Sequence, residues 1–556
     1  MNRRRASRCL SALAVLLLAS AGRPVGLRGQ AAPEGLERKV DAVFARWTGT
    51  TPGCAVGVAS GGAIVLRKAY GLADLEHGAP NGPETIFEAG SVSKQFTAAA
   101  VLLLARDGKL SLDDPARKYL PELPDYGKPL TIRHMLQHTS GLRDWGEVAG
   151  LGGWPRTSRV YTQAHVLDIA SRQRALNFDP GANWSYSNTG YNLAAIIVSR
   201  VSGQSFADFT RTRIFEPLGM TRTSWRDDFR RVVRDRAIAY ADAPGGFRQD
   251  MPFENVHGNG GLLTTVGDLL RWNENFVAPK VGDEAFLREE QQPGRFNDGR
   301  AHDYAFGLFV RTYKGLPEVS HGGSTAGYRA SLARYPGQHL SVAVLCNVSR
   351  GAAEREAHAV ADLYLGDKAT DAPVRAMALT EQDAAAHAGM YRNTTTGTAM
   401  TFVAEKTTLR LEDGRQLFAL SPSRLILPAG ARTLEFDDEG GLRVSADNGT
   451  TETYTRVQPV KPTPAQLAVY AGMYTSDEAE VTLEVLVEGN DLKVARRPDT
   501  RITLRPLYQD AFSGQGLGVV RFQRRGSRVT GLSIVLDRVW DLRFERTATP
   551  GARPPQ

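Results

Sequence analysis

Three short motifs follow one another along the chain, and together they could perform acyl transfer through a serine ester. They are SVSK at residues 91–94, YSN at 186–188 and HGG at 321–323. They supply a hydroxyl nucleophile, groups that can hold or move a proton, an amide, and a glycine-rich edge. Each motif alone is common by chance, so the prediction depends on finding all three in this order.

The first motif combines a nucleophile with a base. Ser91 opens an apolar stretch, SVSKQFTAAAVLLLARDG, that reads as a buried helix ending near Gly108. Lys94 follows Ser91 by one turn, so both side chains lie on one helix face. Burial would lower the lysine pKa and leave a neutral amine that can accept the serine proton.

The second motif lies in a loop ahead of an apolar helix that begins near Tyr191. The phenol of Tyr186 could pass the serine proton to a leaving group, and the amide of Asn188 could bind a substrate amide. Whether Lys94 or Tyr186 is the principal base stays open, because neighbouring groups titrate together.

The third motif follows a short strand-like run. Glycines such as Gly323 let a substrate backbone approach closely. The N–H of Ser324 could join that of Ser91 in an oxyanion hole, and His321 could contact a substrate carboxylate or carbonyl. These residues complete the predicted site: Ser91, Lys94 and Tyr186 as catalytic residues, and Asn188, His321, Gly323 and Ser324 as substrate-binding residues.

With these motifs in place, residues 35–365 resemble the serine β-lactamase and penicillin-recognising hydrolase superfamily, nearest its class C branch. HTSGL at 138–142 and GGLLTT at 260–265 add to the resemblance. It implies that Ser91 is acylated, that Lys94 and Tyr186 handle protons, and that Asn188 touches the substrate. It also implies an α+β fold, with a catalytic domain built from an antiparallel sheet and a helical part.

One departure from that superfamily concerns the third motif, which reads Lys-Thr-Gly in class C β-lactamases and in most penicillin-binding proteins. His321 is a weaker partner for a substrate carboxylate than a permanent cation. The H-x-G form is typical of the esterase and D-aminopeptidase branches, where trailing β-barrel modules also occur and a barrel loop reaches over the active site. The glycine-rich segment 509–518 is our candidate for such a cover, with an ordinary hairpin connection as the alternative.

The order of expected elements agrees with such a body. Strand-like runs at 54–59 and 63–68 form a hairpin around Gly61-Gly62, a mostly helical stretch covers 132–272, and strands return at 304–311, 330–335 and 341–347.

After about residue 370, short alternating runs replace the helical periodicity. AGMY at 388–391 recurs at 471–474, which predicts two tandem β modules, small barrels, joined by a linker at 461–464; one larger β domain is the alternative. We therefore divide the chain into 31–370 (hydrolase domain), 376–460 and 461–549 (β modules).

The N-terminal residues 1–30 read as a signal peptide with a short mature extension. Arginines precede an apolar run at 10–19 that is too short to span a bilayer, and Ala19-Ser20-Ala21 offers a cleavage site; an uncleaved anchor is the alternative. This segment holds much of the net charge of +8 and no acid, so the remainder is nearly neutral and charge gives no reason to expect nucleic-acid binding. We expect a secreted or periplasmic protein with no membrane span after cleavage.

Two cysteines remain after cleavage, Cys54 and Cys346, both in apolar β-like runs. A disulfide is one outcome in an oxidising compartment, but we expect two buried free thiols. His134 and His138 have the spacing of helical metal ligands, yet neither a neighbouring glutamate nor a third ligand is evident, so no metal or organic cofactor is predicted.

The sequence thus predicts a serine hydrolase acting on a small ester, amide or peptide, esterase-like or D-aminopeptidase-like. A penicillin-binding protein, DD-carboxypeptidase or β-lactamase is the first alternative. A non-catalytic peptide or cell-wall binder is the second, and the presence of Ser91, Lys94 and Tyr186 argues against it, because a binder needs none of them.

Overall fold

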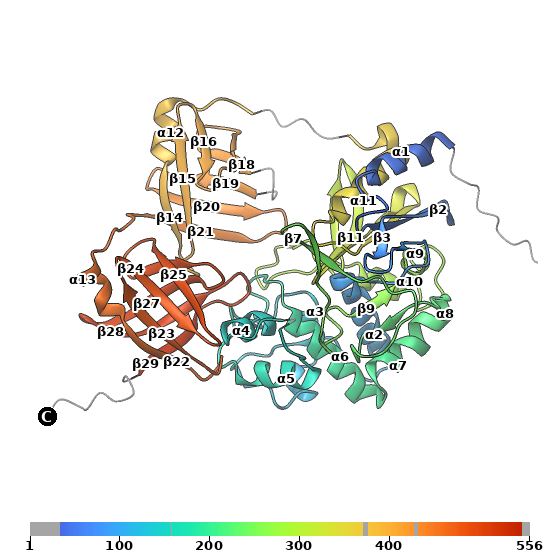
Figure 1. Ribbon diagram of the computed structural model, residues 1–556, viewed down its shortest axis with the longest axis horizontal. Helices are drawn as coiled ribbons and strands as arrows, with labels where there is room; N and C mark the ends of the chain where they lie inside the picture. Colours follow the sequence, from blue (N-terminus) through green and yellow to red (C-terminus); the bar gives the residue numbers. More distant parts are fainter. Residues whose placement is uncertain (1–33, 157, 371–375, 428–431, 548–556) are drawn as a thin grey trace, which may run out of the picture.

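The computed structural model describes residues 34–156, 158–370, 376–427 and 432–547 as three bodies (Figure 1). A mixed helix-and-sheet body holds the N-terminal part of the chain, and two all-β modules follow it. The predicted signal segment lies outside the described residues. No helix in the described ranges is both long and apolar enough to cross a bilayer.

A six-stranded antiparallel sheet forms the centre of the first body, with strand order β10-β11-β12-β13-β1-β2. The first two of these strands in the sequence, β1 and β2, lie at one edge of the sheet, and the last four complete it. This agrees with the prediction that the domain begins and ends with strands. The strands are β1 (Cys54–Ser60), β2 (Ala63–Tyr70), β10 (Phe309–Tyr313), β11 (Leu316–Thr325), β12 (Tyr328–Tyr335) and β13 (Leu340–Cys346).

Both faces of this sheet are buried, which explains why β1 and β13 have no polar side chain apart from Ser60 and Ser341. On one face Val56 and Val58 pack with α1 (Glu34–Phe44) and α11 (Ala353–Leu365). On the other face the alternating residues Ala55 and Ala59 join the core that contains α9 (Val266–Glu274) and α2 (Lys94–Arg106).

The helical part lies between β2 and β10 in the sequence. Its other helices surround α2, which is buried along almost its whole length. Ala98 to Leu104 of α2 form the middle of the largest core cluster, packed against α6. The further helices are α3 (Ile132–Leu136), α4 (Trp145–Leu151), α5 (Gln163–Arg172), α6 (Asn188–Ser202), α7 (Phe206–Thr210), α8 (Glu216–Leu218) and α10 (Glu284–Glu290).

The expectation of two free thiols is wrong. Cys54 and Cys346 form a disulfide, although they lie 292 residues apart. They stand directly opposite each other in the antiparallel pairing of β1 with β13. This cross-strand register brings the two side chains together, and it depends on a long-range pairing that neither local run reveals.

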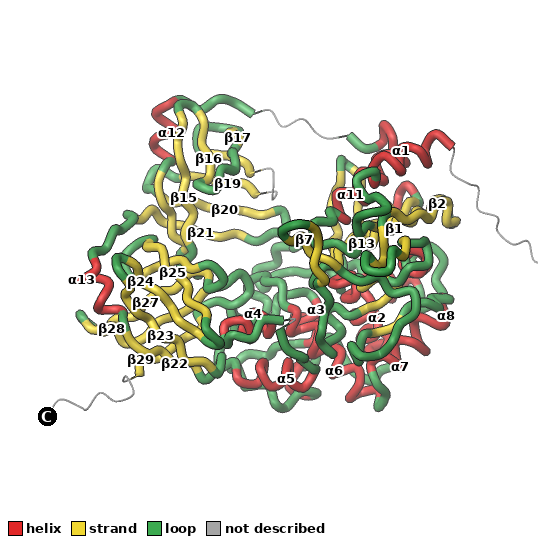
Figure 2. Tube along the Cα trace, viewed as in Figure 1, coloured by secondary structure: helices red, strands yellow, loops and turns green. Residues whose placement is uncertain are grey.

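The two β modules each contain an eight-stranded antiparallel arrangement (Figure 2). The second, β22 to β29, is a closed barrel, and the first is a sheet in the order β16-β15-β14-β21-β20-β19-β18-β17. A bridge between Arg410 and Gln416 brings the two ends of the first sheet together. The strands are β14 (Gly389–Asn393), β15 (Ala399–Glu405), β16 (Thr408–Leu411), β17 (Phe418–Ala419), β18 (Arg424–Leu427), β19 (Arg432–Phe436), β20 (Gly441–Ala446), β21 (Thr451–Val457), β22 (Gly472–Ser476), β23 (Val481–Glu488), β24 (Asp491–Arg496), β25 (Thr500–Pro506), β26 (Ala511–Gly514), β27 (Gly518–Arg525), β28 (Arg528–Val535) and β29 (Leu542–Thr547).

The repeated AGMY sequence occupies the same place in both modules, at the start of the first strand. In each copy the tyrosine ring lies beneath an arginine of the module's last strand, with centroid distances of 5.3 Å for Arg456 on Tyr391 and 5.9 Å for Arg546 on Tyr474. The repeat therefore encodes the contact that joins the first strand to the last. The expected linker at 461–464 leads into a short helix, α13 (Pro464–Leu467).

The barrel packs directly on the catalytic body through α4 and α5. Trp145, Val148 and Leu151 belong to the same apolar cluster as the barrel interior. A buried ion pair between Arg143 and Glu478 (2.8 Å) lies beside that cluster. The barrel is thus fixed close to the residues that follow the HTSGL segment, with consequences for the cavity described below.

Because the disulfide joins two strands of the central sheet, its removal should destabilise the first body. We expect the Cys54→Ala/Cys346→Ala variant to lose about 2 to 4 kcal/mol in the free energy of unfolding. Urea unfolding followed by tryptophan fluorescence measures this loss. Titration of two thiols per chain in denatured, unreduced mature protein would contradict the disulfide.

Candidate active site

Ser91 lies in a tight turn, η1 (Gly90–Ser93), which runs directly into α2. The turn is pressed against β11: a side chain on Gly90, whose φ is +50°, would begin 2.7 Å from the Ser324 nitrogen. Glycine is therefore required here both by conformation and by space. Ser93 has a structural role, since its hydroxyl donates to the Gly90 carbonyl (2.5 Å).

Lys94 is completely buried, and three oxygen atoms surround its amine. Nζ lies 2.7 Å from the Asn259 carbonyl, 2.9 Å from Asn188 Oδ1 and 3.2 Å from Ser91 Oγ. The first two oxygens can only accept, whereas the serine hydroxyl can also donate. A neutral amine satisfies all three, with its two N–H groups on the asparagines and its lone pair on the Ser91 hydroxyl.

The electrostatics favour this neutral form. Burial lowers the pKa of Lys94 well below its ordinary value, and the positive charge of Arg538 lowers it further, while Asp144 acts in the opposite direction. The neutral form, which can accept the serine proton, is therefore more favourable here than in an exposed lysine.

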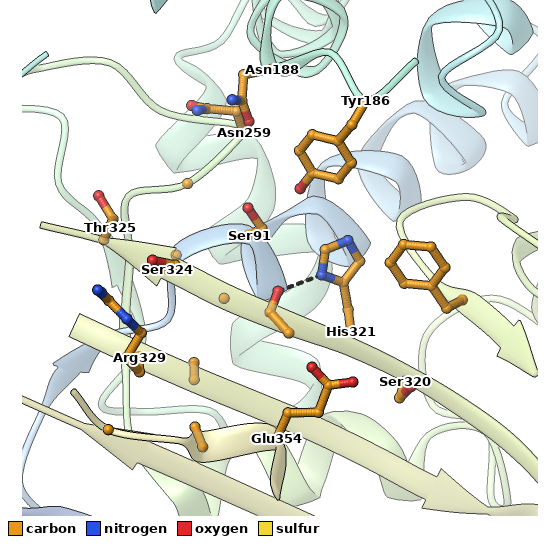
Figure 3. A pocket seen from close by; sticks show the side chains of 18 of the residues that line it. Ser91, Tyr186, Asn188, Asn259, Ser320, His321, Ser324, Thr325, Arg329 and Glu354 are labelled. Carbon is orange, nitrogen blue, oxygen red and sulfur yellow. Dashed lines mark hydrogen bonds between the residues drawn. The ribbon is translucent and has the colours of Figure 1, made fainter. Parts of the chain in front are cut away.

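Tyr186 points its hydroxyl toward Ser91 (Figure 3). Its ring lies against the His138 ring, with a centroid distance of 4.3 Å, and Lys94 Nζ is 4.7 Å from its centre. Burial raises the pKa of Tyr186, so the phenol keeps its proton. The structure thus pairs a deprotonated amine with a protonated phenol, which suits Lys94 as base and Tyr186 as proton donor.

Asn188 and Asn259 complete the surroundings of the lysine amine. Asn188 is the first residue of α6, and its backbone N–H donates to Asp144 Oδ2 (2.9 Å). Asn259 is not among the predicted site residues, although it directly precedes the Gly260-Gly261 segment of the resemblance. Asn192 Nδ2 donates to Asn259 Oδ1 (2.7 Å) and fixes this loop above Lys94.

The HGG segment lies inside β11 and does not follow a strand as expected. Glycines weaken the strand signal, but pairing with β12 determines the conformation. A two-residue turn joins Thr325 to Tyr328, so these two residues exchange backbone hydrogen bonds. Because successive N–H groups of a strand point in opposite directions, the Ser324 N–H points away from β12, to the other edge of β11. That edge faces Gly90, so the Ser324 N–H lies against the turn that carries Ser91.

His321 has both ring nitrogens engaged within the protein. Nδ1 lies 2.5 Å from the Gly322 carbonyl, and Nε2 lies 3.0 Å from the Tyr304 hydroxyl, a residue that the sequence analysis missed. Burial lowers the pKa of His321 to about 3, and the nearby Lys94 adds to this effect. His321 is therefore a neutral wall of the site and supplies no positive charge for a substrate carboxylate.

These residues surround a cavity of about 660 Å³. Ser91, Tyr186, Asn188, His321, Gly323 and Ser324 all line it, so the structure brings the predicted residues together around Lys94. The cavity wall also contains Arg538, from the loop between β28 and β29 of the barrel. Our candidate cover, segment 509–518, is wrong: it forms β26 and the hairpin turn into β27, and none of its residues lines the cavity.

Potential metal ligands gather in two places within the described residues, and neither is at this cavity. One is Glu356 beside the disulfide, and the other is the surface group Asp74, Glu76 and His77. His134 and His138 serve the fold: His134 caps α3, and His138 Nδ1 accepts the Ser187 N–H (3.1 Å).

The Beta-lactamase family matches residues 36–367, well over half of the chain. This protein belongs to that family. A D-aminopeptidase of Gluconobacter oxydans (strain 621H) is 28% identical over 92% of this chain and 98% of its own. Penicillin-binding protein 4* of Bacillus subtilis (strain 168) is 31% identical over 52% of this chain and 66% of its own. As a member of this family, the chain is a serine hydrolase that works by acyl transfer.

Solved structures agree on the fold. The octameric penicillin-binding protein homologue of Pyrococcus abyssi superposes with a TM-score of 0.53 at 24% identity, over 84% of this chain and 99% of that one. The D-amino acid amidase of Ochrobactrum anthropi SV3 reaches a TM-score of 0.52 at 22% identity, over 60% of this chain and 99% of that one.

The lowered lysine pKa predicts how Ser91 reacts as pH changes. Protonated Lys94 cannot accept the serine proton, so labelling by a fluorophosphonate probe should be slow in acid and rise as pH passes through the Lys94 pKa. We expect half-maximal labelling well below the 10.5 of an ordinary lysine. The Lys94→Met variant should lose this dependence, and the exposed Lys109→Met variant should keep it. A midpoint above pH 10 would show that the amine is charged.

Proposed function

We propose that this protein is a secreted hydrolase that cleaves a small ester, amide or peptide through an acyl-enzyme on Ser91. The observation that carries the proposal is the buried Lys94 amine 3.2 Å from Ser91 Oγ, with its other two positions held by Asn188 and Asn259. A serine hydroxyl is a weak nucleophile until a neighbouring base removes its proton.

The geometry supports the following sequence of steps. Lys94 accepts the Ser91 proton as Oγ attacks the carbonyl, and the N–H groups of Ser91 and Ser324 stabilise the oxyanion. Tyr186 donates a proton as the leaving group departs. Water then attacks the ester with the same groups in reverse roles, releasing the acid and restoring the Ser91 hydroxyl.

Two observations favour an esterase or a D-aminopeptidase over a β-lactamase. His321 stands where β-lactamases have a lysine, and its neutral ring is already bound to Tyr304. The D-aminopeptidase of Gluconobacter oxydans matches this chain over both β modules as well as the catalytic domain. A penicillin-binding or DD-carboxypeptidase function is the second candidate, favoured by the likeness to penicillin-binding protein 4*.

Turnover by the mature protein distinguishes these functions. We expect hydrolysis of a p-nitrophenyl ester or of D-alanine p-nitroanilide, with weak action on a chromogenic cephalosporin. The Ser91→Ala variant should lose at least about 1,000-fold in kcat, because the covalent route is closed. Preference for the cephalosporin would support the second candidate. Ligand binding without turnover, with the same affinity in Ser91→Ala as in the wild type, would instead indicate a non-catalytic binder.

We also propose that the protein is exported. The basic and apolar segments of residues 1–30 support this, and so does the Cys54–Cys346 disulfide, because disulfides persist in oxidising compartments. Expression of the full chain in a bacterium should yield a periplasmic or secreted product that begins after Ala21. N-terminal sequencing checks this, and an intact Met1 terminus in a membrane fraction would indicate an uncleaved anchor.

A further inference from the structure

The active-site cavity is lined by permanent positive charges. Four arginines contribute to its wall, whereas Glu354 is its one acidic lining residue; the arginines are Arg156, Arg311, Arg329 and Arg538. Burial disfavours the charged forms of Lys94 and His321, so the arginines are the permanent cations of this wall. The cavity is therefore suited to a substrate that carries a negative charge.

Three of these arginines already have partners within the protein. Arg156 Nε donates to Glu254 (3.0 Å), and its Nη2 contacts the same carboxylate. Arg311 donates to Asp303 (2.5 Å). Arg329 Nη1 donates to two backbone carbonyls, both at 2.7 Å.

Arg538 differs from the other three. In the described part of the chain, its guanidinium makes no hydrogen bond within the protein; Nε is shielded from solvent, and the exposed carboxylate of Asp537 lies 3.5 Å from it. Its Cζ is 4.8 Å from the centre of the Tyr186 ring, so it stands beside the reacting groups. A guanidinium on the wall of the cavity that makes no hydrogen bond within the described residues is a strong carboxylate receptor.

The backbone at Arg538 is held in place by the catalytic domain. Its N–H donates to Glu147 Oε2 (3.0 Å), and its carbonyl accepts from the Asp144 N–H (3.2 Å) and from Asn177 Nδ2 (3.0 Å). Trp540, two residues on, donates its N–H to Asn177 Oδ1 (2.8 Å). The barrel thus presents Arg538 from a fixed loop, which reduces the entropy lost when a ligand binds.

We propose that Arg538 binds a carboxylate of the substrate and favours acidic substrates over their neutral counterparts. This inference rests on the proposed function, since it assigns a substrate class to the same site. The carboxylate belongs either to the acyl part or to the leaving group, and paired substrates distinguish the two. The barrel therefore supplies a cation beside Tyr186, whereas the position of the lysine in the Lys-Thr-Gly motif is occupied by the neutral His321.

Paired substrates that differ in one negative charge test the proposal. The acyl pair is p-nitrophenyl hydrogen glutarate and p-nitrophenyl methyl glutarate. The leaving-group pair is the acetyl esters of 3-carboxy-4-nitrophenol and 4-nitrophenol. The measured quantity is the ratio of kcat/KM for the anionic member to kcat/KM for the neutral member. In Arg538→Gln we expect this ratio to fall about 10-fold or more for one pair, as loss of a charged hydrogen bond predicts.

Two further variants separate recognition from structure. Arg538→Lys should restore part of the ratio, because it keeps the charge but not the fork geometry. The matched control Arg525→Gln, in the exposed β27–β28 hairpin away from the cavity, should leave the ratio unchanged. The pair whose ratio falls identifies the side of the scissile bond that carries the carboxylate.

Failure of this inference differs from failure of the proposed function. Ser91-dependent turnover with ratios that are the same in wild type and Arg538→Gln would overturn the role of Arg538 and leave the hydrolase intact. Absence of Ser91-dependent turnover on all four esters and on D-alanine p-nitroanilide would reject the hydrolase proposal. In that case, calorimetry with 3-carboxyphenylboronic acid and phenylboronic acid tests the role of Arg538. Tighter binding of the carboxylated compound that is lost in Arg538→Gln supports this role, and equal affinities of the wild type for the two compounds overturn it.

Discussion

The burial of one lysine amine is the constraint on which the site depends. A fully buried Lys94 is costly as an ammonium, and the structure offers it two carbonyl-type oxygens, of Asn188 and Asn259, and one hydroxyl, of Ser91. All three hydrogen bonds form when the amine is neutral, donates to the two asparagine oxygens and accepts from the Ser91 hydroxyl. The apolar packing of α2 therefore does more than stabilise the helix, because it also produces the base that the serine needs.

A second constraint is the contact between the η1 turn and the edge of β11. A side chain at Gly323 would begin 2.1 Å from the Ala89 carbonyl, and one at Gly90 would begin 2.7 Å from the Ser324 nitrogen. Two glycines thus let a turn and a strand, more than two hundred residues apart in sequence, meet backbone to backbone. This close approach brings the backbone of Ser324 against the turn that carries the nucleophile.

The sequence predicted the residues whose chemistry follows from type and local spacing. Ser91 and Lys94 lie one helical turn apart, and the repeated AGMY marks the first strand of each β module. Asn188 was expected in a loop ahead of a helix that begins near Tyr191, whereas the helix begins at Asn188 itself. Features that depend on long-range pairing were not predictable in the same way. The disulfide depends on the register of β1 with β13, and Asn259 contributes through its backbone carbonyl, which leaves no trace in residue type. The glycines of HGG have low β propensity, and this segment is a strand because it pairs with β12.

Arg538 illustrates how domain packing adds to a site that motifs alone describe incompletely. Trp145 and Leu151 of α4 share an apolar cluster with the barrel interior, and Asp144, at the N-terminus of the same helix, binds both the Asn188 N–H and the Arg538 carbonyl. One helix end therefore fixes a residue of the site and the barrel loop beside it. The positive charge of Arg538 also helps to keep Lys94 neutral. The barrel consequently acts on the base as well as on the cavity wall, so the second β module is part of the active site and not an appendage to it.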